Sequence, residues 1–214
     1  MNLHKTYDFD YYERGEETGK SCYTNYRWMP EQTLDMCRAI IKYCNIQQDC
    51  KILDFGCAKG FIVKAFRILG YESFGCDISE YAISNCDPEV KDYVSLYKDS
   101  EALKFCDLII SKDVFEHIPY SLIQPLLAKL AGACNYMFVV VPLGKDNKYI
   151  APEYELDVTH IIREDMSWWR STLEIGGFEV VKSSYLAPGI KDNWAHYEKA
   201  NAFFLLKAKK PEND

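Results

Sequence analysis

The sequence lacks several features that would each point to a different class of protein. No apolar run in its 214 residues approaches the length that spans a bilayer. Its first residues show no basic end followed by an apolar stretch, as a secretory signal would. Basic residues are in the minority, with 25 Lys and Arg against 32 Asp and Glu and a formal net charge of -7. We therefore expect neither membrane insertion nor a long nucleic-acid substrate, whose phosphates require a basic surface.

Paired cysteine motifs are missing as well. The nine cysteines are an odd number, and none stands in the C-x-x-C spacing that is typical of zinc or redox sites. They predict reduced thiols and a cytoplasmic protein. With 48% hydrophobic residues the chain can bury a full core. We predict one domain at residues 31–214, preceded by a segment, residues 1–30, that is either a tail or a cover over the site.

Apolar segments rich in β-branched or aromatic residues recur along the chain, with amphipathic stretches between them. This alternation is typical of a parallel sheet covered by crossover helices. Strands are predicted at Lys51–Phe55, Glu72–Asp77, Tyr93–Lys98, Asp107–Ser111, Tyr136–Val141, Phe178–Ser183 and Ala202–Ala208. Helices are predicted at Glu31–Cys44, Gly60–Leu69, Glu80–Asn85, Ser121–Ala131 and Glu164–Ile175.

The connections between these strands predict their directions. The first five strands fit right-handed β-α-β crossovers, so they are expected to be parallel. The last two are separated by a long stretch without a helix-length apolar pattern, which favours an antiparallel pair. The predicted fold class is α/β, with a seven-stranded, mostly parallel sheet, a C-terminal antiparallel hairpin and helices on both faces.

The segment KILDFGCAKGF, residues 51–61, contains the most informative motif. A buried strand ends at the acidic Asp54 and is followed by small residues at Gly56, Ala58 and Gly60. Small residues let the backbone turn sharply and let a ligand approach, and free N–H groups at a helix start attract an anion. The dinucleotide-binding pattern G-x-G-x-x-G fails, because Phe61 stands at its last glycine position.

About twenty residues later, the second strand ends in FGCDIS, where Asp77 can accept hydrogen bonds from both hydroxyls of a ribose. Together with the turn after Asp54, this pattern resembles the first motifs of class I, Rossmann-like, S-adenosylmethionine-dependent methyltransferases. Ala58 departs from the commonest form of that motif, a mild change provided that its backbone keeps a negative φ. The segment KDSEALKFCDLIISKDVFEHIP resembles the family's third and fourth motifs.

The resemblance implies that the chain binds S-adenosylmethionine and releases S-adenosylhomocysteine. In the family, Ile78 would flank the adenine, Asp99 with Ser100 would contact its amino group, and Tyr23 or Arg27 of the cover would hold the cofactor's carboxylate. The candidate cofactor-binding residues are Tyr23, Arg27, Asp54, Gly56, Cys57, Ala58, Gly60, Phe61, Asp77, Ile78, Asp99, Ser100, Ser111 and Lys112.

Two histidines are candidates for removing a proton from an alcohol acceptor. His160 follows the fifth strand on the side where the family builds its acceptor pocket, and Asp157 is expected to orient its imidazole. His117 follows the fourth strand directly. Asp157 and His160 could both face a cation, but the sequence shows no third ligand at an obvious spacing, so we expect no metal. Trp194 and its neighbours, in the last long loop, are expected to contribute to a site.

The same motifs resemble small bacterial methyltransferases of surface-polysaccharide and other cell-envelope pathways. That resemblance implies O-methylation of a small polar acceptor, such as a sugar or a nucleotide-linked precursor, by a monomer or homodimer. An N-methyltransferase or a quinone-type methyltransferase remains an alternative and would have an apolar acceptor pocket. A nicotinamide-dependent oxidoreductase is disfavoured, because the chain has no Tyr-x-x-x-Lys pair. A catalytically inert binding module is a further alternative.

Overall fold

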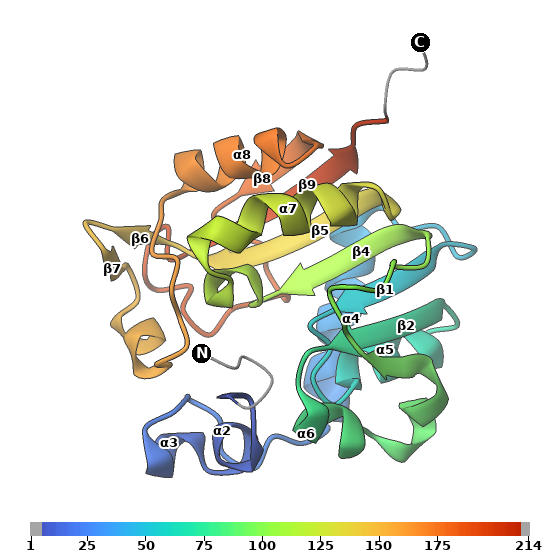
Figure 1. The fold of residues 1–214 in the computed structure, drawn as a ribbon, viewed down its shortest axis with the longest axis horizontal. Coiled ribbons are helices and arrows are strands. Elements are labelled where there is room, and N and C mark those ends of the chain that lie inside the picture. The colour runs from blue at the N-terminus through green and yellow to red at the C-terminus, as the bar shows by residue number, and fades with distance from the viewer. Residues whose placement is uncertain (1–5, 211–214) are drawn as a thin grey trace.

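The computed structural model describes residues 6–210, and its centre is one large sheet (Figure 1). The strands of this sheet are β1 (Lys51–Phe55), β2 (Glu72–Asp77), β3 (Val94–Leu96), β4 (Cys106–Lys112), β5 (Cys134–Pro142), β8 (Phe178–Ser184) and β9 (Asn201–Ala208). They form a seven-stranded sheet in the order β3-β2-β1-β4-β5-β9-β8. The neighbours among β1 to β5 pair in parallel, whereas β9 is antiparallel to both β5 and β8. The predicted fold class is confirmed.

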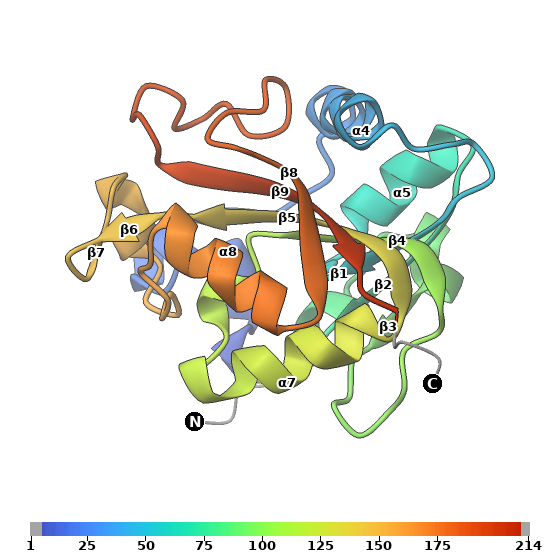
Figure 2. The same cartoon turned by 90° about the horizontal axis from the view of Figure 1, so that it is seen from above.

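Helices cover both faces of the sheet, as predicted (Figure 2). One face carries α4 (Pro30–Cys44) and α5 (Phe61–Ile68), and the other carries α7 (Tyr120–Ala131) and α8 (Met166–Ile175). The inner strand β5 packs against both helix layers, because successive side chains of a strand point to opposite faces. Met137, Val139 and Val141 pack with α7 and α8, while Phe138 and Val140 pack with α4 and α5. The short helix α6 (Glu80–Ser84) follows β2.

The predicted strands and helices agree with the observed ones to within two residues at each end. The elements that the sequence analysis missed are all short. They are α2 (Phe9–Glu13), α3 (Gly15–Thr18), the strands β6 (Gly144–Lys145) and β7 (Lys148–Tyr149), and the 3₁₀ turns Pro88–Tyr93, Phe115–His117 and Pro152–Leu156. Elements of this length show no detectable hydrophobic period, so side-chain caps and tertiary contacts decide them.

The sequence predicted reduced thiols and no membrane insertion, and the structure bears on both. All nine cysteines are free thiols. Within residues 6–210, no helix combines the length and the apolarity needed to cross a membrane.

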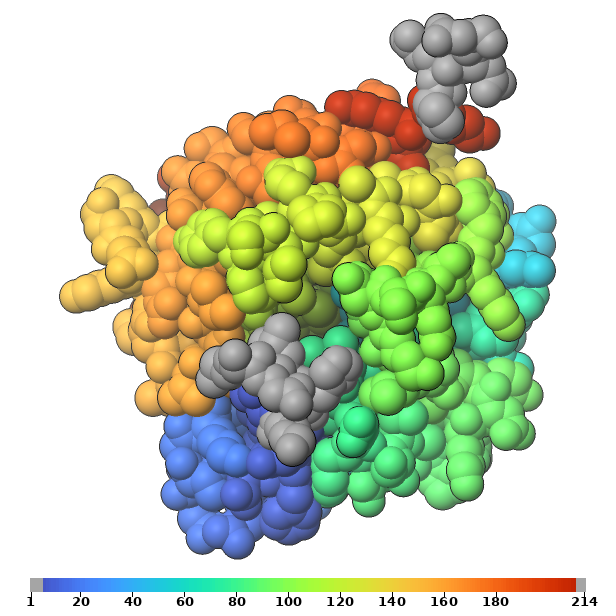
Figure 3. Space-filling view, in the orientation of Figure 1, coloured from blue at the N-terminus to red at the C-terminus, as the bar shows by residue number. Residues whose placement is uncertain are grey.

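The strand order reverses between β1 and β4, which places a crevice at their carboxyl ends. The N-terminal segment lies along this edge of the sheet. In the space-filling view its blue surface packs between the green and the orange parts of the chain (Figure 3). Of the predicted cover segment, residues 1–5 lie outside the described residues, and residues 6–30 pack against the site that the next section describes.

The turn between β1 and α5 has an unusual backbone. Gly56, Ala58 and Gly60 all have positive φ, at 86°, 47° and 80°. The condition under which Ala58 would be a mild departure from the motif, a negative φ, is therefore not met. A left-handed conformation costs a residue with a Cβ about 1 kcal/mol or more. The Ala58 N–H donates to Asp77 Oδ2 at 2.8 Å, which holds the strained residue in place.

We predict that Ala58→Gly leaves the free energy of unfolding unchanged within about 0.5 kcal/mol or raises it, because relief of the strain offsets the extra backbone entropy of glycine. Ala65→Gly, the same substitution in the buried face of α5, is the matched control. It should lower the free energy of unfolding by about 1 kcal/mol or more. Urea denaturation measures both values. Equal losses in the two variants would contradict the strain at Ala58.

Candidate functional site

A cavity of about 180 Å³ lies at the carboxyl ends of β1, β2 and β4. We call it the first cavity. Its floor is the turn after β1, one wall is the end of β2 with Ile78, and the opposite wall follows β4. Of the candidate cofactor-binding residues, those that line it are Tyr23, Asp54, Gly56, Cys57, Ala58, Asp77, Ile78 and Lys112. Residues from four separate regions of the sequence are thus brought together at the topological switch point.

Asp77 ends β2 with its side chain held in one orientation. Oδ2 accepts a hydrogen bond from Ala58 N, and Oδ1 accepts one from Ser79 N, both at 2.8 Å. Burial raises the pKa of Asp77, although hydrogen bonds from the backbone of Ser79, Ala58 and Ile78 oppose that shift. Each carboxylate oxygen has a further lone pair, so the fixed carboxylate can still accept hydrogen bonds from a pair of neighbouring hydroxyl groups.

Asp54 lies deeper, at the end of β1, and is 3% exposed. Its Oδ2 has no hydrogen-bond partner among the described residues. Burial, with a further contribution from Asp77, raises the pKa of Asp54 to about 8, while Lys112 opposes the rise. A buried carboxylate oxygen without a partner is costly unless a ligand supplies a donor or a positive charge. The first cavity therefore fits a ligand that carries a ribose, a flat base and a cationic group.

The N-terminal segment forms the roof of this cavity. Tyr7, Tyr11, Tyr12, Tyr23 and Tyr26 all line it, and their rings pack edge-to-face or stacked on one another. Part of the roof was missed by the sequence analysis, which had selected only Tyr23 and Arg27 from this segment. The tyrosine-rich composition of residues 7–26 was the available signal.

Two polar contacts attach this roof to the cofactor turn and to β2. Lys59 Nζ, in the turn, donates to Glu13 and to the carbonyl oxygen of Tyr26, the latter at 2.9 Å. Ser79 Oγ donates to the carbonyl oxygen of Tyr7 at 2.6 Å. Ser79 also caps α6 and donates its N–H to Asp77. The same residue therefore holds both the roof and the Asp77 carboxylate in place.

Some predicted cofactor residues lie elsewhere. Asp99 and Ser100 line a separate surface hollow, and the Asp99 side chain is 90% exposed. The chain turns outward after β3, so that Tyr97 lines the first cavity in their place. Gly60 caps α5 without lining the first cavity, and Ser111 is buried in β4 with its hydroxyl unpaired among residues 6–210.

A second, larger cavity of about 860 Å³ adjoins the first. Lys112, Asp113, His117 and Tyr23 line both, so the two spaces meet at the carboxyl end of β4. Two residues predicted to bind the cofactor, Arg27 and Phe61, line only this second cavity. The predicted acceptor residues Asp157, His160 and Trp194 also line it, together with Asp192 and Asn193 of the last loop.

The imidazole of His160 is oriented by the backbone and not by Asp157, which corrects the expectation from sequence. His160 Nδ1 lies 2.7 Å from the carbonyl oxygen of Tyr154, whereas its Nε2 is 4.0 Å from Asp157 Oδ2. The Asp157 carboxylate instead accepts hydrogen bonds from the hydroxyls of Tyr11 and Thr159, at 2.7 and 2.5 Å. Asp157 thereby joins the roof segment to the acceptor side of the site.

His117 and Glu116 complete this side of the site. Burial and the neighbouring His160 lower the pKa of His117 to about 4, and burial also lowers the pKa of His160. Both rings are therefore neutral at pH 7. Glu116, which the sequence analysis did not select, is fully buried beside them, with burial raising its pKa well above the usual range. Its place directly before His117 in FEHIP was the available signal.

A charged group lies after β4, where the two cavities meet. Asp113 accepts from Lys112 Nζ at 2.5 Å and also from Lys191 Nζ, which reaches in from the last loop. Burial would raise the pKa of Asp113, but the two ammonium groups outweigh it and hold that pKa below the usual range. This arrangement attaches the last loop to the sheet, and both lysine ammonium groups are paired with Asp113.

The sheet order, the carboxylates at its switch point and the adjoining second cavity together define a Rossmann-like α/β enzyme of the methyltransferase class. A family model for a methyltransferase domain matches residues 28–187. The chain belongs to that family, and its cofactor is S-adenosylmethionine. The carboxylates of Asp54 and Asp77, and the apolar wall at Ile78, fit this cofactor on the geometry described above.

Solved structures share this fold at low sequence identity. A TehB-like S-adenosylmethionine-dependent methyltransferase from Corynebacterium glutamicum is 17% identical, with a TM-score of 0.60 over 82% of this chain and 88% of that one. A methyltransferase from Archaeoglobus fulgidus is 20% identical, with a TM-score of 0.64 over 84% and 94%. The magnesium protoporphyrin IX methyltransferase from Synechocystis, solved with bound S-adenosylhomocysteine, is 14% identical, with a TM-score of 0.61 over 84% and 83%. Among curated proteins, none matches the sequence.

We predict that Asp77→Ala weakens binding of S-adenosylmethionine by about 1.5 to 3 kcal/mol, because it removes a fixed, charged hydrogen-bond acceptor. Isothermal titration calorimetry measures the loss. Asp99→Ala is the matched control, since that side chain is 90% exposed and does not line the first cavity, and its affinity should equal that of the wild type. Unchanged affinity in Asp77→Ala, with the fold intact by circular dichroism, would remove Asp77 from the cofactor site.

We also predict that the contribution of Asp54 to the stability of the ligand-free protein falls as pH rises from 5 to about 8, the pKa of its buried carboxyl group. Between its ordinary value and the folded-state value, Asp54 binds a proton in the native state but not in the unfolded chain, so a rising pH favours unfolding. Asp54→Asn should flatten this slope and be the more stable protein at pH 8.5, by about 1 kcal/mol or more. Urea denaturation at several pH values measures the effect. Parallel curves for the two proteins would show that Asp54 keeps an ordinary pKa.

Proposed function

We propose that the chain transfers a methyl group from S-adenosylmethionine to a hydroxyl or similar oxygen of a small polar acceptor, such as a sugar or a nucleotide-linked precursor of a surface polysaccharide. The observation that carries this proposal is a group of buried polar side chains in the lining of the second cavity. Glu116, His117, Asp157, His160 and Lys191 all contribute to that lining, directly beside the first cavity.

In this proposal the first cavity holds the cofactor and the second holds the acceptor. When bound, the cofactor supplies an electrophilic methyl group on a sulfonium. The protein's contribution is to hold the acceptor oxygen in line with that group and to exclude water. The tyrosine roof and the last loop, attached through Lys59 and Lys191, serve the second purpose. The acceptor oxygen forms the new O–C bond, its proton passes to a nearby base or to water, and the electron pair of the broken C–S bond stays on sulfur.

The polar lining also separates this proposal from its alternatives. An N-methyltransferase of small amines needs no base, and a quinone-type enzyme would offer its acceptor an apolar pocket. The two neutral imidazoles and the buried carboxylate of the second cavity would be costly to bury in such a pocket. They are well suited to an acceptor that carries hydroxyl groups.

The test is methyl transfer to a panel of acceptors. The purified protein is incubated with S-adenosylmethionine and, separately, with sugars, nucleotide sugars, small amines and quinols, and the release of S-adenosylhomocysteine is measured. Release with a hydroxyl-bearing sugar or nucleotide sugar, with the methyl group on oxygen by mass spectrometry, supports the proposal. Release only with amines or quinols contradicts it.

We predict that His160→Ala slows turnover of such an acceptor by roughly 10²-fold or more and leaves the affinity for S-adenosylmethionine intact. The reason is that His160 lines only the second cavity, where it faces Glu116. His196→Ala is the matched control, because His196 lies in the last loop and lines neither cavity. Turnover and calorimetry on the same preparations measure both effects. A near-normal rate in His160→Ala would reduce that residue to a structural role.

A further inference from the structure

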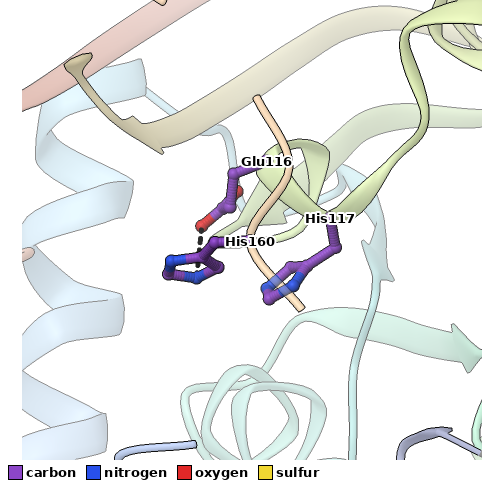
Figure 4. A group of neighbouring side chains, drawn as sticks. All are labelled: Glu116, His117 and His160. Carbon is purple, nitrogen blue, oxygen red and sulfur yellow. Dashed lines mark ion pairs between the residues drawn. The ribbon is translucent and has the colours of Figure 1, made fainter. Parts of the chain in front are cut away.

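Glu116, His117 and His160 form a compact group on the wall of the second cavity, here called the Glu116–His117–His160 cluster. Glu116 and His117 come from the 3₁₀ turn after β4, and His160 comes from the segment after β7. One potential ligand atom of each residue lies within 4.8 Å of the other two. Figure 4 shows the three side chains converging, with the Glu116 carboxylate directed at the His160 ring.

The hydrogen bonds of His160 determine which of its nitrogens is free. Nδ1 lies 2.7 Å from the carbonyl oxygen of Tyr154, which can only accept, so Nδ1 carries the proton. In the neutral ring Nε2 then has an unshared lone pair. That atom lies 4.0 Å from Glu116 Oε1. His160 therefore presents the lone pair of Nε2 to the Glu116 carboxyl group.

The same reasoning applies to His117 through one further step. The Thr159 hydroxyl donates to Asp157 Oδ1 at 2.5 Å, so its oxygen is left to accept. His117 Nδ1, 2.8 Å from that oxygen, therefore carries the proton of the neutral ring. His117 Nε2 is again the nitrogen with a free lone pair. Both rings are held by their Nδ1–H groups, one by a backbone carbonyl and the other by a hydroxyl backed by a carboxylate.

Glu116 supplies the carboxyl group of the cluster, which a bound cation would hold in its charged form. It is 0% exposed, and neither carboxylate oxygen has a hydrogen-bond partner among the described residues. The nearest candidate cation of the site, Lys191, donates to Asp113 instead. A fully buried carboxylate without a donor costs several kcal/mol unless a positive charge or a proton meets it. Two imidazoles and this buried carboxyl group thus lie close together, and no other described residue donates a hydrogen bond to the carboxyl oxygens.

We propose that the Glu116–His117–His160 cluster binds a divalent transition-metal ion of the Zn²⁺ type. Two imidazoles and one carboxylate form a common ligand set for such ions, and catalytic zinc sites leave a further position open. Ligand atoms at about 2.1 Å from one tetrahedral ion are about 3.4 Å apart, so side-chain movements of roughly 1 Å bring the three together. The support of each Nδ1–H by a second group is typical of histidines that ligate metals.

The ion's open position would face the second cavity, which the cluster lines. This role rests on the proposed function, because it assigns the ion to the acceptor. An acceptor hydroxyl bound to a divalent cation loses its proton more readily, which favours attack by oxygen. The expectation of no metal from sequence rested on a missing third ligand. The fold supplies that ligand as Glu116, more than forty residues before His160 in the chain.

The test uses the purified full chain, stripped of metal with a chelator and titrated with ZnCl₂ by calorimetry in the absence of cofactor and acceptor. One ion per chain at micromolar affinity or tighter is expected. Glu116→Gln, which keeps the side-chain volume, and His160→Ala should each weaken binding at least about 10-fold. His196→Ala, which changes a histidine outside the cluster, should bind like the wild type. No binding, or equal binding in all four proteins, overturns the proposal.

The nine free cysteines require a second measurement on the wild type alone. With Co²⁺ in place of Zn²⁺, the proposed ligands give visible bands of a four- or five-coordinate ion with nitrogen and oxygen donors. An intense thiolate-to-Co²⁺ band in the near ultraviolet would assign the ion to cysteine and overturn the proposal. This readout holds even where a variant fails to fold.

These measurements need no methyl transfer, so they distinguish the two proposals. Zn²⁺ binding that depends on Glu116 supports the metal site even where no oxygen acceptor is methylated, a result that would contradict only the proposed function. Methylation of an oxygen acceptor by a stripped protein that binds no Zn²⁺ would overturn the metal site and leave the proposed function standing.

Discussion

The hydrogen bond from Ala58 N to Asp77 Oδ2 is the contact on which the site depends. It joins the turn after β1 to the end of β2, and it is possible only because the turn alternates left-handed residues at Gly56, Ala58 and Gly60. That alternation directs the Ala58 N–H toward the neighbouring strand end. Asp77 is thereby fixed before any ligand arrives, which lowers the entropy lost on binding. The roof segment attaches to the same place through Lys59 and Ser79.

The sheet and its main helices were predictable, because long elements carry their period in the sequence. The β1 turn and Asp77 were predictable for another reason, since parallel strands adjacent in the sheet bring their carboxyl ends together whatever the intervening chain does. Asp99 shows that this reasoning does not extend to residues beyond the strand end. Whether a residue beyond a strand faces the cavity depends on the direction in which the chain leaves the sheet, and that direction comes from packing. Tyr97, two residues earlier, lines the cavity instead.

Glu116 and Asp157, which line the second cavity, show the same limit of prediction from sequence. Sequence spacing suggested that Asp157 supports His160, because the two are three residues apart. In the fold, Tyr154 supports His160 and Asp157 turns to Tyr11 and Thr159. These contacts join segments far apart in the chain, so no local pattern encodes them. Glu116 looked like an ordinary loop residue, and only its complete burial reveals the demand for a partner.

The two cavities therefore differ in which of their polar side chains lack a partner, and this difference indicates which ligand each cavity suits. In the first, Asp54 and Asp77 leave carboxylate oxygens available beside apolar walls, which a cationic nucleoside can satisfy through charge and hydroxyl groups. In the second, the Glu116–His117–His160 cluster offers two imidazoles and a buried carboxyl group, while the nearby Lys191 is engaged by Asp113. A neutral hydroxyl can donate a single hydrogen bond, so it meets only one of these three groups. A divalent cation meets all three at once and leaves a position for the acceptor oxygen.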